Sequence, residues 1–375
     1  MTRDVVVTGI GLISSLGEGP ETHVAALTDH AAPVVDLERF APYPVHPMAA
    51  LELDRQIPKK SDQRQMEAWQ RLGVYAAGLA LDSAGLKDQP EAKAKLECIV
   101  AAGGGERDHA VDAQVLTGIR AAVDKEAYLN ERLMGDLRPT LFLAQLSNLL
   151  AGNISIVHGI TGASRTFMGE EQCGVDAIRT ATARIAHGQC ETMLVGGAYN
   201  AERQDMLLLL ELGGCLWKDA FKPVFERAAG GGGLITGSMA AFLVLEAREA
   251  AEARGATILA RVAGVAADQC RRTTGGAVTA SLAGLIGQVG GARLVIATSS
   301  GVAPIADEER AAIGQGAPGA EIMALGDLVG HGLEAAFPVG VALAAAAIAA
   351  GVADEVVVAG AGHQRGEGAA RLAKA

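Results

Sequence analysis

The sequence has few aromatic residues and no excess of positive charge. Aromatic side chains make up 3% of its 375 residues, and the formal net charge at pH 7 is −11. Proteins that bind nucleic acids combine basic patches with aromatic side chains that stack on bases. This composition therefore argues against a nucleic acid as the main partner.

Paired cysteines and long apolar runs are missing as well. None of the five cysteines forms a C-x-x-C pair or shows metal-ligand spacing, which predicts a protein without a metal site in a reducing compartment. The first residues, MTRDVVVTGIG, lack the charged and apolar regions of a secretion signal. The apolar stretch 339–352 is too short to span a bilayer and predicts a buried helix. We therefore expect a cytoplasmic protein with no membrane span.

Glycine and aliphatic residues are abundant instead. Half of the residues are hydrophobic and 48 are glycine, which suits helices and strands that pack closely and are joined by tight turns. In each half of the chain, a long helix precedes a valine-rich strand and a glycine-rich turn, MLVGGA and VVVAGAG. This repeat predicts an internally duplicated α/β fold whose sheets are covered on both faces.

The predicted elements follow from the apolar periodicity. They are strands at 5–8, 98–102, 154–157, 164–168, 193–195, 240–245, 293–297, 321–324 and 355–358, helices at 62–84, 139–150, 172–187, 280–288, 307–313 and 337–350, and an irregular cap at 199–235.

The glycines after the first strand invite a dinucleotide-binding interpretation. That motif needs G-x-G-x-x-G, but Gly9 and Gly11 are followed by Ser14 at the third position. The missing glycine is the one that lets the next helix pack closely against the strand. We therefore expect no cofactor.

The segment GASRTFMGEEQCG, residues 162–174, is typical of a catalytic turn. The predicted strand meets a tight corner before a helix that begins near Gln172, and such corners lift a nucleophile into a pocket. The apex residue is Glu171, whereas the nearby thiol of Cys173 lies two residues further on. A carboxylate thus occupies the place where a nucleophile is expected.

Five segments occur in an order that is typical of one enzyme family. They are VVVTGIGLISSLG at 5–17, SNLLAGNISIVHGITGAS at 147–164, GVDAIRTATARIAHGQCETMLVGGA at 174–198, PVFERAAGGGGLITGSMAAFLVLE at 223–246 and GHGLEAA at 330–336. Together they resemble the β-ketoacyl-acyl carrier protein synthases, the elongating condensing enzymes of the thiolase superfamily. The resemblance implies a thiolase-like duplicated five-layered αβαβα fold. Its N-terminal half with the cap would be 1–250, and its C-terminal half 251–375.

The resemblance also assigns the catalytic positions, most of which are altered. The family's nucleophilic cysteine lies nine positions after the glycine of the preceding loop and three before a helix glycine. Counting forward from Gly162 and back from Gly174 leads to Glu171 both times. The family's first histidine aligns with Thr298, and its second is retained as His331.

The substrate-binding region is assigned by the same resemblance to Phe142, Cys173 and Gly326. The family's lysine, five positions before the second histidine, aligns with Gly326. Each pocket of the family's dimer is partly lined by the neighbouring subunit. We expect the apolar stretch 138–150, which contains Phe142, at this interface because its hydrophobic residues cover more than one helix face.

The chemistry of condensation explains why these changes matter. The reaction requires a thiolate that holds the acyl chain and donor groups that stabilise the enolate formed when malonyl loses carbon dioxide. Glu171 is a far weaker nucleophile, but its charge suits a helix N-terminus, where we expect it to accept backbone N–H groups and hold the turn. The sequence keeps the turn and removes the reaction. It therefore predicts a non-catalytic subunit of fatty acid biosynthesis that shapes the acyl pocket of an active synthase, as chain-length factors do.

The resemblance implies two partners, an acyl carrier protein and either an active synthase subunit or a second copy of this chain. Such a carrier protein is acidic, so it would bind a local basic patch on this chain, although the chain as a whole is acidic too. The pattern is also similar to divergent synthase-like proteins that serve very-long-chain acyl groups of bacterial lipid A.

Two alternatives stay open. The first is a working 3-oxoacyl synthase that uses Cys173 in a shifted turn, or a malonyl decarboxylase that uses His331 without a covalent step. Glu171 speaks against decarboxylation because it would repel the malonyl carboxylate. The second is a protein that binds an acyl chain or an acyl carrier without any synthase partner.

Overall fold

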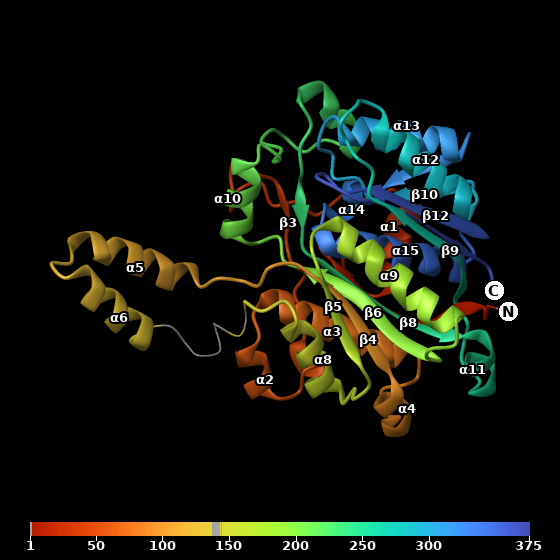
Figure 1. The fold of residues 1–375 in the computed structure, drawn as a ribbon, viewed down its shortest axis with the longest axis horizontal. Helices are drawn as coiled ribbons and strands as arrows, with labels where there is room; N and C mark the ends of the chain where they lie inside the picture. The colour runs from red at the N-terminus through yellow and green to blue at the C-terminus, as the bar shows by residue number, and fades with distance from the viewer. Residues whose placement is uncertain (1, 137–142, 144) are drawn as a thin grey trace.

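Two half-sheets that repeat one strand pattern form the centre of the molecule (Figure 1). The computed structural model describes residues 2–136, 143 and 145–375. The strands of this part are β1 (Val5–Ser14), β2 (Gly17–Glu18), β3 (Val45–His46), β4 (Glu97–Ala102), β5 (Ser164–Met168), β6 (Thr192–Tyr199), β7 (Thr236–Gly237), β8 (Met239–Ala247), β9 (Ala260–Asp268), β10 (Leu294–Ala297), β11 (Glu321–Ala324), β12 (Glu355–Ala361) and β13 (Glu367–Ala373).

The described helices surround these strands. They are α1 (Pro20–Thr28), α2 (Lys60–Gln65), α3 (Ala68–Ser83), α4 (Pro90–Lys95), α5 (His109–Ala121), α6 (Lys125–Gly135), α8 (Leu149–His158), α9 (Glu171–Ala186), α10 (Gln204–Leu212), α11 (Arg248–Ala253), α12 (Ala277–Val289), α13 (Ile305–Gly316), α14 (Leu325–Val329) and α15 (Ala336–Ala349). Three short 3-10 helices, at Leu53–Arg55, Val224–Gly230 and Leu333–Ala335, complete the set.

The strand pattern of the first half recurs in the second. β1 pairs antiparallel with β8 and β8 with β6, after which β6, β4 and β5 run parallel. In the second half β9 pairs antiparallel with β13 and β13 with β12, after which β12, β10 and β11 run parallel. The halves meet where β1 pairs with β9. This repeat confirms the duplicated α/β fold that the sequence predicted.

Helices form three layers around the two half-sheets. α9 and α15 lie between the halves, where α9 contacts β6 and β9 and α15 contacts β8 and β12. α3 and α8 cover the outer face of the first half, and α12 and α13 cover that of the second. All but one residue of α15 is buried, which explains why this helix is apolar on every side. The arrangement is the expected five-layered αβαβα fold.

The glycines of the first strand serve close packing. A side chain at Gly11 would place its Cβ 1.9 Å from the carbonyl oxygen of Ala76, and one at Gly9 would lie 2.3 Å from that of Ala80. Both carbonyls belong to α3, so the glycines let this helix lie directly against β1. Packing between helix and strand therefore accounts for the two glycines.

Three predictions of secondary structure are wrong, and a fourth fails in part: of the helix expected at 139–150, residues 139–142 and 144 lie outside the described part, and 145–148 are not helical. The helix expected at 62–84 is interrupted at Met66, whose extended backbone separates α2 from α3. Residues 154–157, expected as a strand, belong to α8, because a short apolar run has no periodicity that distinguishes a strand from a buried helix. The cap at 199–235 contains a regular helix, α10. The division between the halves expected at 250 falls inside α11 and stays a prediction.

A helical hairpin, α5 and α6, projects away from the layered body (Figure 1). Neither of these two helices has a buried side chain. Gly118 leaves room between them for the ring of Tyr128, whose hydroxyl would lie 1.8 Å from a Cβ there. Within the described part of the chain, no helix combines the length and apolarity needed to cross a bilayer.

The close contact at Gly11 leads to a stability prediction. Gly11→Ala should lower the free energy of unfolding by about 3 kcal/mol, because the methyl group has backbone rather than a flexible side chain in its way. Gly284→Ala in α12 is the matched control, since nothing lies within 4 Å of its Cβ position, and it should be neutral or stabilising by up to about 1 kcal/mol. Urea denaturation measures both, and equal stabilities of the two variants would contradict the packing argument.

Candidate active site

Helix α9 begins at a sharp corner after strand β5. The strand ends at Met168, Gly169 adopts a φ of 154° that favours glycine, and the helix starts at Glu171. The strand has the bounds that the sequence predicted, and Glu171 lies at the helix N-terminus as expected. The unpaired N–H groups of this first turn create a partial positive charge beside the carboxylate.

Two histidines of the C-terminal half hold the carboxylate of Glu171. His331 Nε2 lies 3.0 Å and His363 Nδ1 lies 2.8 Å from the same oxygen, Oε1, and the backbone N–H of His363 donates to it at 3.3 Å. All three side chains are buried, with exposed fractions of 9% for Glu171, 3% for His331 and 2% for His363. The prediction that Glu171 bonds to N–H groups of its own turn is therefore wrong, because its partners come from distant segments.

The electrostatics of this cluster favour a charged carboxylate. Burial alone would raise the pKa of Glu171, but hydrogen bonds from His331 and His363 outweigh burial and hold this pKa well below its usual range. Burial lowers the pKa of His363, and the hydrogen bond to Glu171 outweighs that effect, so the pKa of His363 is raised. An ionised carboxylate can only accept hydrogen bonds, so His331 Nε2 and His363 Nδ1 must each carry a hydrogen. The carboxylate at the corner is therefore ionised, and the raised pKa of His363 favours an imidazolium beside it.

The cavity beside Glu171 is very small. It has a volume of about 10 Å³ and is lined by Thr298, Phe337 and the loop at 360–362 among others. A single water molecule needs about 10–15 Å³, so an acyl chain does not fit there. The Thr298 hydroxyl donates to the carbonyl of Ala359 at 3.4 Å. The structure therefore brings Thr298, Glu171 and His331 together. Protein atoms occupy nearly all of the space beside Glu171.

Cys173 is the third residue of helix α9, two positions after Glu171, and it does not line this cavity. Its thiol donates to the carbonyl oxygen of Glu170 at 3.0 Å, and its side chain packs in the hydrophobic cluster between the half-sheets. Burial, together with the nearby carboxyl groups of Glu334 and Glu171, raises the pKa of the thiol far above its usual range. A buried, protonated thiol is a poor nucleophile.

Gly326, another predicted substrate-binding residue, does not line the cavity either. Gly326 lies in α14, where an added Cβ would be 2.8 Å from Val224 Cγ2 and 3.6 Å from the carbonyl oxygen of Ser299. Phe142 lies outside the described residues. Their assignment to substrate binding stays a prediction.

His363 is the site residue that sequence reasoning missed. It follows β12 in the segment AGAGHQRG, which matches the family's glycine-rich turn only loosely. The turn itself is tight, since Gly362 N–H donates to the Gly366 carbonyl at 2.8 Å. The sequence offered one indication, a histidine in a glycine-rich turn after a buried strand. That pattern alone does not distinguish a site residue from a surface residue.

Two further carboxyl groups are buried near the site. Burial raises the pKa of Glu309 to about 8, although Ser299 and the Ala361 N–H approach its carboxyl and oppose the shift. Burial also raises the pKa of Glu334 to about 8, although its Oε1 accepts the Gly103 N–H at 2.9 Å. Both groups are therefore largely protonated at neutral pH. No set of three or more metal-ligating side chains within the described residues is placed to hold a metal ion.

Comparison with known proteins places this geometry in a family. The sequence model described as "Beta-ketoacyl synthase, N-terminal domain" matches residues 2–251. The chain belongs to the β-ketoacyl synthase family. The matched region includes the corner at Glu171, whereas Thr298, His331 and His363 lie beyond it.

Curated relatives include a 3-oxoacyl-[acyl-carrier-protein] synthase and a subunit of a polyketide synthase. A "3-oxoacyl-[acyl-carrier-protein] synthase 2" of Vibrio harveyi is 29% identical over 271 residues, which cover 70% of this chain and 62% of the relative. The "Tetracenomycin polyketide synthase ketoacyl synthase beta subunit" of Streptomyces glaucescens is 30% identical over 276 residues, which cover 69% of this chain and 62% of the relative. The chain thus aligns with less than two thirds of the length of these relatives.

Solved structures of β-ketoacyl synthases share the whole fold. A structure titled "The ishigamide ketosynthase/chain length factor" superposes with a TM-score of 0.81 at 23% identity, over 100% of both chains. A β-ketoacyl synthase from Burkholderia phymatum STM815 gives a TM-score of 0.78 at 18% identity, also over 100% of both chains. The thiolase-like fold predicted from the sequence is confirmed.

The burial of Cys173 predicts that this β-ketoacyl synthase homologue resists thiol-directed acylation. Incubation with cerulenin or acyl-carrier thioesters, followed by mass spectrometry, should detect no adduct at Glu171 or Cys173. Cys190 and Cys215 are only partly buried and should react with iodoacetamide, which provides the control for a folded, reagent-accessible protein. A stoichiometric adduct at Cys173 would overturn this prediction.

The raised pKa of Glu309 predicts how stability depends on pH. The unfolded state releases the Glu309 proton near pH 4.5, whereas the folded state keeps it up to about pH 8, so this group lowers stability progressively between these values. Glu309→Gln should therefore gain stability over the wild type as the pH rises from 5 to 8, on the order of a few kcal/mol at pH 8. Urea denaturation at several pH values measures the difference. Exposed Glu91→Gln is the control, and a Glu309→Gln difference that stays constant with pH would refute the assignment.

Proposed function

We propose that this protein is a non-catalytic β-ketoacyl synthase subunit that pairs with a catalytically complete synthase and shapes its acyl pocket in fatty acid biosynthesis. The observation that carries the proposal is the ionised Glu171 at the position assigned to the nucleophile, bonded to His331 and His363. This arrangement holds no group that could form a thioester, and the adjoining cavity of about 10 Å³ has no room for an acyl chain.

The chemistry of the site counts against a working enzyme. Cys173 is buried and its thiol is bonded to a backbone carbonyl, so it does not substitute for the missing nucleophile. A decarboxylase would need donor groups free to stabilise an enolate, but His331 already donates to Glu171. The fixed charge of Glu171 would also repel the malonyl carboxylate.

Exposed apolar side chains support a protein partner. Leu116, Met134, Leu209 and Leu212 are 64%, 88%, 61% and 78% exposed, and they lie on α5, α6 and α10. A groove of about 740 Å³ runs between the hairpin and α10, and its lining includes the aliphatic side chains of Val111, Val115, Leu116, Leu129, Leu133 and Leu208. Patches of this kind on a protein mark surfaces that bind other proteins.

The edge of the first half-sheet supports the same partner. Strand β5 ends the sheet and pairs only with β4 among the described strands, and Met168 at its end is 72% exposed. An open edge can pair with a strand of another chain. The solved relative titled as a ketosynthase and chain length factor has the fold of this chain, which favours a second synthase subunit as the partner.

Co-expression with the β-ketoacyl synthases of the source organism tests the proposal. We expect one of them to co-purify with this protein, and the pair to release acyl chains whose length distribution differs from that of the synthase alone. This protein alone should produce no β-ketoacyl product from malonyl and acyl carrier thioesters. Condensation by the isolated chain would refute the proposal, and so would its failure to bind any of the synthases.

The interface is tested by charge substitutions on exposed positions. Leu116→Asp and Leu209→Asp should each weaken association at least about tenfold without loss of fold, because both side chains are more than half exposed. Val352→Asp, in the loop before β12 of the other half, is the control and should leave association unchanged. Sedimentation velocity with the co-purified synthase measures the effect. Wild-type affinity of both leucine variants would place the interface elsewhere.

Restoring the thiol alone should not restore activity. Glu171→Cys leaves a threonine at Thr298 and glycine at Gly326, and the small cavity beside the corner still excludes an acyl chain. We therefore expect no elongated product in a condensation assay, and a matched Glu171→Gln variant should behave in the same way. Measurable elongation by Glu171→Cys would mean that the reaction needs neither a histidine at position 298 nor a lysine at position 326.

A further inference from the structure

The projecting hairpin is attached to the body through a short connecting segment, here called the strap, that begins with three consecutive glycines. The strap, residues 103–107, leaves the end of β4 and leads into α5. Three successive glycines give a chain more conformational freedom than any other residue type. A Cβ at Gly104 would meet nothing within 4 Å, so close packing does not require a glycine there. The direction of the hairpin must therefore be fixed by specific contacts.

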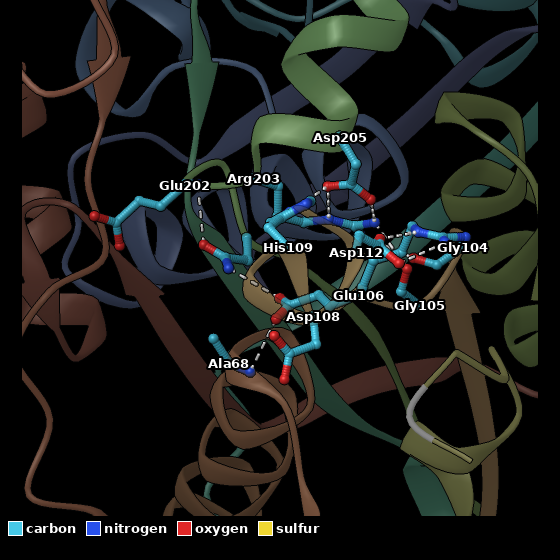
Figure 2. A network of polar contacts seen from close by, with 12 residues as sticks. Ala68, Gly104, Gly105, Glu106, Asp108, His109, Asp112, Glu202, Arg203 and Asp205 are labelled. Carbon is cyan, nitrogen blue, oxygen red and sulfur yellow. Dashed lines mark hydrogen bonds and ion pairs between the residues drawn. The ribbon is translucent and has the colours of Figure 1, made fainter. Parts of the chain in front are cut away.

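Arg203 supplies the first set of contacts (Figure 2). Its Nη1 donates to the carbonyl oxygen of Gly104 at 2.9 Å and its Nη2 to that of Gly105 at 2.8 Å. The carboxylate of Asp205 holds the guanidinium from the other side, with Nε to Oδ1 at 3.1 Å and Nη2 to Oδ2 at 2.6 Å. Arg203 is only 7% exposed. The planar guanidinium thus spans two consecutive peptide groups of the strap, a geometry that an ammonium group does not reproduce.

Glu106 supplies the second set of contacts (Figure 2). Its Oε1 accepts the Trp69 N–H at 3.0 Å and the side-chain amide of Asn200 at 2.9 Å, and its Oε2 accepts the Ala68 N–H at 3.2 Å. Ala68 and Trp69 open helix α3, so Glu106 compensates the free N–H groups of a core helix. Glu106 therefore ties the strap to the body. If it moved, the N–H groups of Ala68 and Trp69 would lose their hydrogen-bond acceptor.

Two contacts at Gly103 close the root of the strap. Its N–H donates to Glu334 Oε1 at 2.9 Å, and its carbonyl accepts the hydroxyl of Ser147 at 2.5 Å. Every residue from Gly103 to Glu106 is therefore bonded to the body through its backbone or its side chain. By contrast, the helices that follow bury none of their side chains.

We propose that Arg203, with Glu106, is a positioning residue that fixes the direction of the α5–α6 hairpin and holds its apolar face, Val111, Val115, Leu116, Leu129 and Leu133, ready for the partner synthase subunit. The inference about the partner rests on the proposed function. The inference about the hairpin stands on the contacts of the strap alone. Arg203 acts only through its contacts with the strap.

Hydrogen–deuterium exchange tests the positioning directly. Arg203→Lys keeps the charge but loses the two-carbonyl geometry, and we expect amide exchange in residues 103–121 to accelerate at least about tenfold. Exchange in α15 reports the body and should stay unchanged. Asp205→Asn, which removes the carboxylate that orients the guanidinium, should change the same residues to a smaller extent. Arg179→Lys on α9, an arginine paired with Asp176 at 3.0 Å, is the matched control and should leave the strap unchanged.

Association with the co-purified synthase tests the consequence. Arg203→Lys should weaken it at least about tenfold in sedimentation velocity, although position 203 lies outside the apolar face of the hairpin. Unchanged exchange in the strap would overturn the positioning role of Arg203. If exchange accelerates but association stays unchanged, the inference that the hairpin binds the partner synthase is wrong. If the wild-type protein binds no synthase, the proposed function fails, whereas the exchange result still decides the role of Arg203.

Discussion

The carboxylate of Glu171 is bonded across the boundary between the two halves of the fold. Helix α9 belongs to the first half and lies in the central layer, while His331 and His363 come from the second half. Hydrogen bonds to an ionised group are stronger than neutral ones, and burial removes the water that would compete for them. The corner at Glu171, to which the sequence resemblance assigns the nucleophile of a condensing enzyme, therefore forms a cross-link between the two halves. The tight loop after β12 and the small cavity both lie beside this contact.

One ionised carboxylate imposes a condition on its neighbours. Glu309 and Glu334 are fully enclosed, and the charge of Glu171 adds to the effect of burial that raises the pKa of each. Several buried carboxyl groups close together cannot all be ionised, so the cluster keeps one charge where histidines stabilise it and leaves the others protonated. A catalytic corner needs the opposite arrangement, in which donors stay free for the developing charge of a substrate.

The sequence predicted the parts of the site that depend on local order. Spacing between Gly162 and Gly174 located Glu171, and the bounds of β5 agree with the structure. Contacts between distant segments could not be predicted in this way. His363 lies 192 residues after Glu171 in the sequence. It comes close to Glu171 only because strand β12, which precedes it, is paired into the sheet of the second half. The run at 154–157 failed for another reason, because apolar character alone does not distinguish a strand from a helix that packs under a sheet.

The corner and the hairpin share the segment from His331 to Glu334. His331 donates to Glu171, and three residues later Glu334 accepts the first N–H of the strap that carries the hairpin. Leu333, between them, adopts a φ of 40°, an unusual conformation for a residue with a branched side chain. A segment with bonds at both ends and a constrained backbone cannot shift at one end without a cost at the other. Under the proposed function, the corner would therefore stay constrained without catalysis, because the same contacts define the root of the hairpin.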